Sequence, residues 1–348
     1  MKNPFSTLYG IIPSSLVFRN DSFEQIIADF TNEDINAATY IITGIRGSGK
    51  TVLLHSVTRE LQLYSNWVII SLNPQGDFVS SMAEQLYDEV KKNRLGLDWS
   101  IDLSLPYVTF HIKKNQMSLS SESAIPHLLE ILKKQNKRVL ISIDEVNSTN
   151  KLKYFANMYQ HLISEDYPLF LLMTGLFENI DSLISSKAAS FLARSPKIVL
   201  NPLNLISVSQ MYQKELNATV DEANKLAILS KGYAFAYQII GKICFERKKN
   251  IIDDDLLLSL DNYLSSNGYN VIWKGMTDVE KKICIAISKL DNNSTKNIIE
   301  NIHMKVANFN NYRAKMIYKG YLEAKGYGEI EFSLPRFKEF VLKIEALM

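Results

Sequence analysis

The sequence contains little that would cross-link the chain or anchor it in a membrane. Only two of its 348 residues are cysteines, Cys244 and Cys284, and each is isolated within an apolar helical pattern. This excludes a disulfide framework and a cysteine-based zinc site, and it favours two small core residues. No segment approaches the roughly 20 apolar residues that span a bilayer, and the N-terminus shows no apolar run with a cleavage site. We therefore expect a cytoplasmic protein without a membrane partner.

An excess of charge of one sign is missing as well. The 39 basic and 37 acidic residues leave a net charge of +2, so any contact with nucleic acid must come from a local patch. The five histidines show no metal-ligand spacing with one another or with the cysteines. No G-x-S-x-G elbow surrounds Ser142, so a hydrolase with a serine nucleophile is unsupported.

What the sequence does have is an alternation of short aliphatic runs with longer amphipathic stretches from Tyr40 to Leu200. This rhythm predicts an α/β fold in which helices cover a parallel sheet. Five runs are predicted as its strands: Tyr40–Thr43, Trp67–Leu72, Arg138–Ile143, Leu169–Thr174 and Ile198–Leu200. Between the second and third, residues 100–114 alternate apolar and polar side chains around Pro106, which favours a hairpin or loop over a helix.

After Asn201-Pro202 the pattern becomes helical only, and it changes again near Met276. Four stretches are predicted as helices of a small lid: 208–216, 220–230, 233–246 and 254–264. The rest predicts helices at 277–290, 294–302 and 308–321, a strand pair around residues 325–334, and a last helix opened by Pro335. This order is that of a winged helix. We therefore expect a core at 1–205, a helical lid at 206–270 and a winged-helix domain at 271–348.

The segment Gly44-Ile45-Arg46-Gly47-Ser48-Gly49-Lys50-Thr51 satisfies the phosphate-loop pattern G-x-x-x-x-G-K-[ST]. It follows a predicted strand and opens a predicted helix that continues through Val52. The glycines let several backbone N–H groups converge, and the helix N-terminus adds partial positive charge, so the loop can cradle phosphate oxygens. Lys50 would reach the β- and γ-phosphates, and Thr51 offers a hydroxyl to Mg²⁺. The segment predicts a site for ATP and magnesium.

The apolar run that begins at Arg138 ends in two carboxylates, Asp144 and Glu145. The carboxyl end of a parallel strand lies beside the phosphate loop in such folds. We therefore predict that Asp144 holds a water on Mg²⁺ and that Glu145 orients or deprotonates the attacking water. Thr174 ends the next strand and is predicted to touch the γ-phosphate or that water. Asn73, after the second strand, is a candidate for restraining Glu145, although Thr and Asn at strand ends are also ordinary turn residues.

Together these residues resemble the AAA+ ATPases, and within them the origin-recognition-like and STAND-type ATPases of bacteria and archaea, over most of the chain. Residues 3–19 are similar to the family segment that lies against adenine and ribose, although Phe18 stands where the family often has glycine. The resemblance implies adenine packing by Leu16 and Val17. It also implies that Arg194 is an arginine finger, which neutralises transition-state charge on a neighbouring subunit's nucleotide. An arginine that merely caps its helix end is the alternative.

The predicted lid departs from the family pattern at two points. Residues 232–238 are similar to the Gly-x-Pro segment of the STAND relatives, but Ala234 replaces the proline. The arginine that standard AAA+ proteins carry in the lid is absent from that position. These departures imply slow hydrolysis, with bound nucleotide acting as a conformational switch.

The winged-helix interpretation makes residues 308–321 the candidate recognition helix. The residues predicted to be exposed on it are Asn308, Asn311, Arg313, Lys315 and Lys319. Such a face permits a contact between residues 276–348 and the phosphates of double-stranded DNA. Winged helices also dock proteins, so the fold does not decide between these partners.

The sequence leaves three functions open. The first is an ATP-dependent molecular switch or motor that acts on DNA through its C-terminal domain. The second is a STAND-like signalling or defence ATPase, in which ATP exchange exposes a surface for a protein partner or for a second copy of the chain. The third, a small-molecule kinase, shares the phosphate loop but does not account for the lid and the winged helix.

Overall fold

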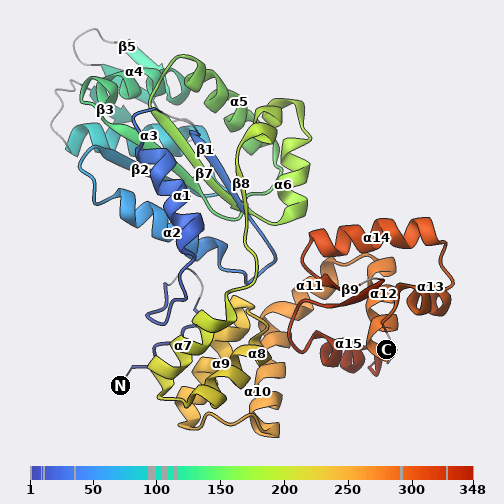
Figure 1. Ribbon diagram of the computed structural model, residues 1–348. Helices are drawn as coiled ribbons and strands as arrows, with labels where there is room; N and C mark the ends of the chain where they lie inside the picture. Colours follow the sequence, from blue (N-terminus) through green and yellow to red (C-terminus); the bar gives the residue numbers. More distant parts are fainter. Residues whose placement is uncertain are drawn as a thin grey trace. The chain divides into compact units, whose positions relative to one another are not determined.

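The computed structural model describes residues 2–347 except 9, 11, 35–36, 93–98, 103–108, 113–116, 291–292 and 327. The chain forms two compact units, which are both visible in Figure 1. The sheet unit comprises Asn20–Thr43 and Lys50–Val199, and the helical unit comprises Met1–Arg19, Gly44–Gly49 and Leu200–Met348. Within the described part of the chain, no helix combines the length and the apolar character that crossing a membrane requires.

The sheet unit is built on a five-stranded parallel sheet with the order β2-β6-β7-β1-β8 (Figure 1). Its strands are β1 (Thr39–Thr43), β2 (Trp67–Leu72), β6 (Arg138–Ile143), β7 (Leu169–Gly175) and β8 (Lys197–Val199). Every strand coincides with a predicted run to within one residue at each end. The predicted α/β fold with a parallel sheet is therefore confirmed.

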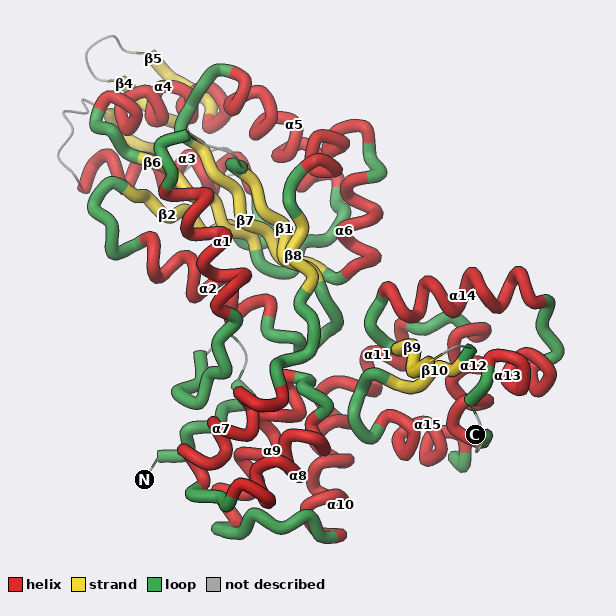
Figure 2. The backbone as a smooth tube through the Cα atoms, viewed as in Figure 1, coloured by secondary structure: helices red, strands yellow, loops and turns green. Residues whose placement is uncertain are grey.

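Helices cover both faces of this sheet (Figure 2). Successive residues of a strand point to opposite faces, so the apolar side chains of these strands need a helical layer on each side. They are α1 (Asn20–Thr31), α2 (Lys50–Leu61), α3 (Phe78–Lys92), α4 (Ser121–Lys134), α5 (Asn150–Ser164), α6 (Phe177–Ile184) and the 3₁₀ helix η1 (Lys187–Arg194). On one face, Phe30 of α1 packs against the rings of Tyr40, Trp67 and Phe170. On the other, residues of α3, α4, α5 and α6 share one apolar cluster with strand residues such as Ile141.

The insertion between β2 and β6 contains a small antiparallel sheet. Its strands are β3 (Trp99–Asp102), β4 (Thr109–Ile112) and β5 (Met117–Ser120), in that order. The expectation of a hairpin or loop in residues 100–114 is confirmed where these strands lie. Its remaining parts, 103–108 and 113–114, lie outside the described residues.

The segment predicted as a lid consists of helices. They are α7 (Leu205–Leu216), α8 (Val220–Ser230), α9 (Ala234–Arg247) and α10 (Asp254–Leu264), followed by the short π helix η2 (Ser265–Tyr269) and α11 (Asn270–Gly275). The N-terminal segment packs on α9, where Phe5 lies against Gly241 so closely that an added Cβ would stand 2.3 Å from the ring. The absence of a side chain at Gly241 therefore allows the N-terminal segment to pack closely on α9.

The C-terminal part has the predicted order of elements. They are α12 (Asp278–Lys289), α13 (Thr295–Ile302), α14 (Val306–Tyr318), the antiparallel pair β9 (Leu322–Gly326) and β10 (Glu329–Phe332), and α15 (Phe337–Glu345). Thr277 caps α12 through a capping box with Glu280. The last helix starts at Phe337 and not at Pro335, because Arg336 has a left-handed backbone conformation with a φ of 58°.

One apolar core runs through the whole helical unit, from Phe5 to Val341. Polar contacts add to it. Arg336, just before α15, donates two hydrogen bonds to the carboxylate of Asp261 in α10, at 2.8 and 2.7 Å. Lys231, at the end of α8, donates to Phe332 O of the hairpin at 2.6 Å. The division that we propose near residue 270 therefore separates two parts of a shared core.

Candidate functional site

The loop Gly44–Gly49 lies in the helical unit and has an unusual backbone. Gly47 and Gly49 have positive φ values of 77° and 96°, which side chains disfavour. At Gly47 a side chain is excluded a second time, because an added Cβ would lie 2.4 Å from Tyr233 Oη. The glycine therefore allows both the turn of the loop and the close approach of the lid.

Three consecutive carbonyl groups of this loop accept hydrogen bonds from the lid and the N-terminal segment. The bonds run from Tyr233 Oη to Arg46 O (2.8 Å), from Phe235 N–H to Gly47 O (3.2 Å) and from Arg19 Nη2 to Ser48 O (3.0 Å). Tyr233 and Phe235 lie at the start of α9, and the Phe235 N–H is one of the first-turn N–H groups that have no partner within the helix. The loop is thus held from outside by groups of its own unit.

Sequence reasoning did not single out Arg19, Tyr233 or Phe235 as parts of this arrangement. The sequence places Arg19 only within the N-terminal segment, and it places the two aromatic residues within a predicted lid helix and the segment similar to Gly-x-Pro. Which carbonyl a side chain reaches depends on tertiary packing. Burial lowers the pKa of Arg19 to about 10, so its guanidinium stays charged at neutral pH.

Within the sheet unit, three predicted residues come together around one carboxylate. Thr51, in the first turn of α2, donates from Oγ1 to Asp144 Oδ2 at 2.8 Å. Thr174, at the end of β7, donates from Oγ1 to Asp144 Oδ1 at 2.5 Å. The side chain of Lys50 is buried beside Thr51 in sequence, at the start of the same helix. Asp144 is therefore held in one orientation by two hydroxyl groups.

Glu145 follows with a left-handed backbone, at a φ of 54°, and an exposed side chain. Its N–H donates to Thr174 Oγ1 at 2.9 Å, so Thr174 fixes both acidic residues. Asn73, predicted to restrain Glu145, instead accepts a hydrogen bond from Gln75 N–H in its own turn, at 2.9 Å. The exposed carboxylate of Glu145 is the one suited to meeting a water molecule.

The donor set fits magnesium. Asp144 and Thr51 supply a carboxylate and a hydroxyl oxygen, which are the hard ligands that Mg²⁺ prefers. In nucleotide sites, phosphate oxygens and waters provide most of the octahedron, so one or two protein oxygens suffice. Among the residues that the structure describes, no group of three or more His, Cys, Asp or Glu side chains is placed to hold a metal. A carboxylate and a hydroxyl oxygen suit an ion whose other ligands are phosphate oxygens and waters.

The loop also contains a buried polar group without a protein partner. Ser48 is 4% exposed, and its Oγ has no hydrogen-bond partner among the described residues. Buried hydroxyl groups are normally paired, so an orphan in this loop needs an explanation. A phosphate oxygen would supply the missing acceptor. Arg46 and Val52, also predicted for the site, are half-buried.

Other predicted residues lie apart from these contacts. Arg194 is the last residue of η1 in the sheet unit, and it is exposed. Val17 is 7% exposed and belongs to the core of the helical unit, whereas Leu16 is half-buried. Adenine packing by these two residues and the finger role of Arg194 stay predictions.

The structure contradicts one feature predicted for the candidate recognition helix. Its predicted surface residues are exposed at Asn308, Asn311 and Lys315 and half-buried at Arg313. Lys319, however, is 6% exposed, and its ammonium lies 3.0 Å from Glu280 Oε1. The helical pattern predicts Lys319 on the surface, but this residue is the C-cap of α14 and its side chain is buried against the buried carboxylate of Glu280 in α12.

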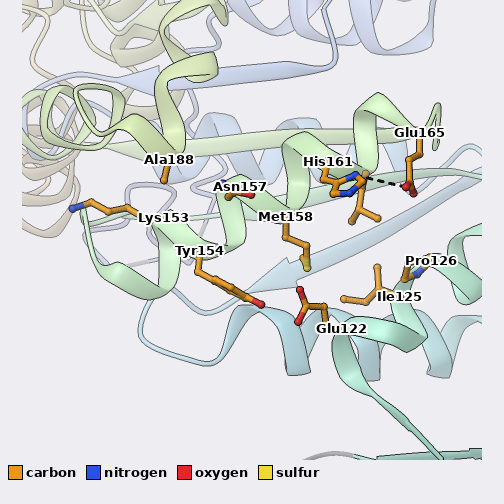
Figure 3. A pocket seen from close by; sticks show the side chains of 11 residues that line it. Glu122, Ile125, Pro126, Lys153, Tyr154, Asn157, Met158, His161, Glu165 and Ala188 are labelled. Carbon is orange, nitrogen blue, oxygen red and sulfur yellow. Dashed lines mark ion pairs between the residues drawn. The ribbon is translucent and has the colours of Figure 1, made fainter.

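A cavity of about 560 Å³ lies elsewhere in the sheet unit, lined by α4, α5 and η1 (Figure 3). A hydrogen bond to Glu122 raises the pKa of Tyr154 there. His161 Nδ1 lies 3.6 Å from Glu165 Oε1 at the same cavity. None of the predicted site residues lines it, so it takes no part in the arrangement around Asp144.

Comparisons with known proteins bear on the fold. A family described as a domain of unknown function, DUF8462, matches residues 266–341. A comparison with curated proteins finds no match. Among solved structures, the ORC2 protein of Aeropyrum pernix in its ADPNP and ADP complexes is similar over 100% of this chain and 99% of its own, with a TM-score of 0.61 and 12% identity. The ADP form of that protein gives a TM-score of 0.53 and 13% identity over 98% and 97% of the two chains.

Cdc6p of Pyrobaculum aerophilum is similar over 98% of both chains, with a TM-score of 0.50 and 13% identity. At such low identity these matches concern the fold, and they extend over the full length of the chain. The order of the parallel sheet and the full-length matches together show that the chain shares the fold of the Aeropyrum pernix ORC2 protein and of Pyrobaculum aerophilum Cdc6p.

Proposed function

We propose that this chain binds ATP with Mg²⁺ and hydrolyses it slowly, as a nucleotide-controlled switch. The observation that carries the proposal is the hydrogen-bonded set of Thr51, Asp144 and Thr174. Thr51 of this set lies in the first turn of α2, directly after the glycine loop in the sequence. A carboxylate fixed by two hydroxyl groups next to a phosphate-loop lysine is what a magnesium–nucleotide site requires. The nucleotide-bound complexes of the ORC2 protein support this assignment.

We assign the phosphate contacts to the loop and to the first turn of α2. They come from Gly44, Arg46, Gly47, Ser48, Gly49, Lys50, Thr51 and Val52. The loop N–H groups and the positive end of α2 favour the charged phosphates. The ammonium of Lys50 would reach the β- and γ-phosphates, and Thr51 and Asp144 would hold the magnesium ion with its waters. Bound Mg²⁺ supplies charge that offsets the phosphate charge developed in the transition state.

Glu145 would act on the attacking water, because its carboxylate is exposed while its backbone is fixed by Thr174. Thr174 acts through Asp144 and Glu145, since its hydroxyl contacts both residues. Phosphoryl transfer depends mainly on positioning and electrostatics, so this fixed geometry is the main contribution of the sheet unit.

Two substitutions test the site. We expect Lys50→Ala to weaken binding of a non-hydrolysable ATP analogue by more than about tenfold, because a charge-assisted contact to phosphate is lost. We expect Glu145→Gln to retain binding but to slow phosphate release by about 100-fold, because the amide cannot take a proton from water. Calorimetric titration and phosphate release measure the two effects, and Glu130→Gln on α4 serves as a charge-matched control.

Equal nucleotide affinity of the Lys50→Ala protein and the natural protein would refute the site. Transfer of phosphate to a small acceptor, in place of phosphate release, would instead support the kinase alternative.

We further propose that α12 to α15 form a winged helix, and that α14 contacts double-stranded DNA. The exposed face of α14 carries Asn308, Asn311 and Lys315, which can donate to phosphate oxygens and base edges. The hairpin β9–β10 is less suited to contact DNA phosphates, because it is acidic. It carries one lysine, Lys325, against three glutamates, Glu323, Glu329 and Glu331. We therefore assign the DNA contact to the helix and not to the hairpin.

The same acidic hairpin favours the STAND-like alternative, in which this part meets a protein. Lys231 of the lid lies 3.5 Å from Glu323 Oε1 and 3.6 Å from Glu331 Oε1. A basic protein surface would compete with Lys231 for these carboxylates. Under this alternative, ATP exchange releases the hairpin toward a protein partner or a second copy of the chain.

A further inference from the structure

We propose that Tyr233 is a positioning residue that holds the phosphate loop in its binding conformation and so makes nucleotide affinity depend on the packing of the lid. The inference rests on the proposed nucleotide site and adds a means of regulating it. It is carried by the three hydrogen bonds that reach consecutive carbonyls of the loop, at Arg46, Gly47 and Ser48.

These bonds fix the direction of the peptide planes. In a trans peptide the C=O of one residue and the N–H of the next point to opposite sides of a rigid plane. Holding the carbonyls of Arg46, Gly47 and Ser48 on the lid side therefore turns the N–H groups of Gly47, Ser48 and Gly49 to the other side. A phosphate loop needs its N–H groups turned toward one point, away from its own carbonyls.

Two of those three N–H groups are available to a ligand. Ser48 N–H donates to Ile45 O at 3.2 Å within the loop. The N–H groups of Gly47 and Gly49 donate to no acceptor in the part of the chain that is described. Together with the orphan hydroxyl of Ser48, they leave the loop with donors that a phosphate would satisfy.

Tyr233 is suited to this task because it is a rigid donor. It is 5% exposed and is the N-cap of α9, yet its side chain does not cap the helix. The hydroxyl reaches Arg46 O instead, and Gly47 leaves room for it. Burial raises the pKa of the Tyr233 hydroxyl, so it remains protonated and able to donate throughout the physiological pH range.

The coupling works in both directions. If lid packing holds the loop in its binding conformation, then bound nucleotide must stabilise the lid by the same free energy. The packing of the lid and the binding of the phosphates are therefore coupled through the backbone of the loop. No charged lid side chain on the γ-phosphate is needed, which accounts for the missing lid arginine.

The test compares two substitutions of the same kind. Tyr233→Phe removes the hydroxyl that reaches the loop, and Tyr212→Phe removes an equally buried hydroxyl that donates to Tyr237 O at 2.9 Å within the lid. We expect Tyr233→Phe to raise the Kd for a fluorescent ATP analogue by about 3- to 10-fold, the effect of losing one hydrogen bond. KM for ATP should rise with little change in kcat, and Tyr212→Phe should leave Kd unchanged.

Thermal unfolding separates positioning from folding. Both variants should lose similar stability without nucleotide, but only Tyr233→Phe should gain less stability on adding the analogue. Arg19→Lys provides a second variant, because it keeps the charge but cannot bridge Ser48 O and Asn201 O as the guanidinium does. It should also weaken binding.

Unchanged affinity in both Tyr233→Phe and Arg19→Lys would overturn the inference while leaving the nucleotide site intact. Equal weakening by Tyr233→Phe and Tyr212→Phe would also overturn it, because the effect would then belong to the lid fold. Failure of the natural protein to bind the analogue would overturn the proposed function itself, and this inference with it.

Discussion

Glu280 and Lys319 form an ion pair in the C-terminal part of the helical unit, at 3.0 Å and with side chains 0% and 7% exposed. Glu280 also accepts a hydrogen bond from Thr277 N–H at 2.8 Å. Burial alone would raise the pKa of Glu280, but the Thr277 N–H and the Lys319 ammonium outweigh it and lower that pKa. A buried pair is costly to form, yet removing one partner leaves an unpaired charge in the core.

We therefore expect Lys319→Met to lower the free energy of unfolding by about 3 kcal/mol near neutral pH. The glutamate pKa is lowered by folding, so its stabilising effect is present above the ordinary value of 4.5 and is lost as the pH falls through the lowered value. Below that pH, the free energies of unfolding of the variant and the natural protein should become more similar. Protonation of Glu280 removes the attraction to Lys319 in the natural protein, and it removes the unpaired buried charge in the variant.

Denaturant unfolding at several pH values measures this difference. Lys225→Met is the matched control, because Lys225 pairs with Asp221 at 2.6 Å but both side chains are more than half exposed. It should change stability by less than about 1 kcal/mol. A Lys319→Met effect no larger than that of the control would contradict the expectation.

At the scale of elements, α14 carries the prediction about nucleic acid. We expect Lys315→Ala to weaken binding of a duplex uniformly across sequences and to reduce the salt dependence by about one counterion, because Lys315 is exposed and has the chemistry of a phosphate contact. Arg313→Ala should add to the loss. Fluorescence anisotropy at several salt concentrations measures both, and Lys214→Ala on α7 is the control.

Absence of duplex binding with ATP analogue, with ADP and without nucleotide would remove the DNA hypothesis. A rise in mass in solution with the analogue, without any duplex binding, would then favour the STAND-like alternative. A chain that stays monomeric under all three conditions would count against the STAND-like alternative.

The elements themselves were largely predictable, because each strand is a short apolar run and each lid helix has an apolar face. Thr51, Asp144 and Thr174 meet because β6 and β7 end at the edge of the sheet where α2 begins, which the motif spacing already implies. The contacts that individual side chains make across the fold were harder to predict. Lys319 is buried against Glu280, 39 positions earlier in the chain, and the hydrogen bond from Tyr233 to Arg46 joins residues 187 positions apart.

At the scale of the whole molecule, the open question is whether the site is complete in one chain. Asp144, Glu145 and Thr174 form a connected set in the sheet unit, whereas Arg194 ends η1 with an exposed side chain. An exposed arginine can serve the nucleotide of a neighbouring copy, because transition-state charge on the phosphate can be neutralised from outside. That arrangement requires a head-to-tail contact between copies.

We expect Arg194→Ala to slow ATP hydrolysis by at least about tenfold without changing nucleotide affinity, because the arginine would act only in the transition state. Lys187→Ala, an exposed cation at the other end of η1, should leave hydrolysis unchanged. The sharper experiment mixes Arg194→Ala with Glu145→Gln, two proteins that are each nearly inactive. If the arginine acts on a neighbouring copy, random mixing restores about one interface in four, because half the sites keep Glu145 and half the neighbours keep Arg194. Phosphate release by the mixture should then approach a quarter of the natural rate, whereas an arginine that acts within its own chain would leave the mixture at the mean of the two variants.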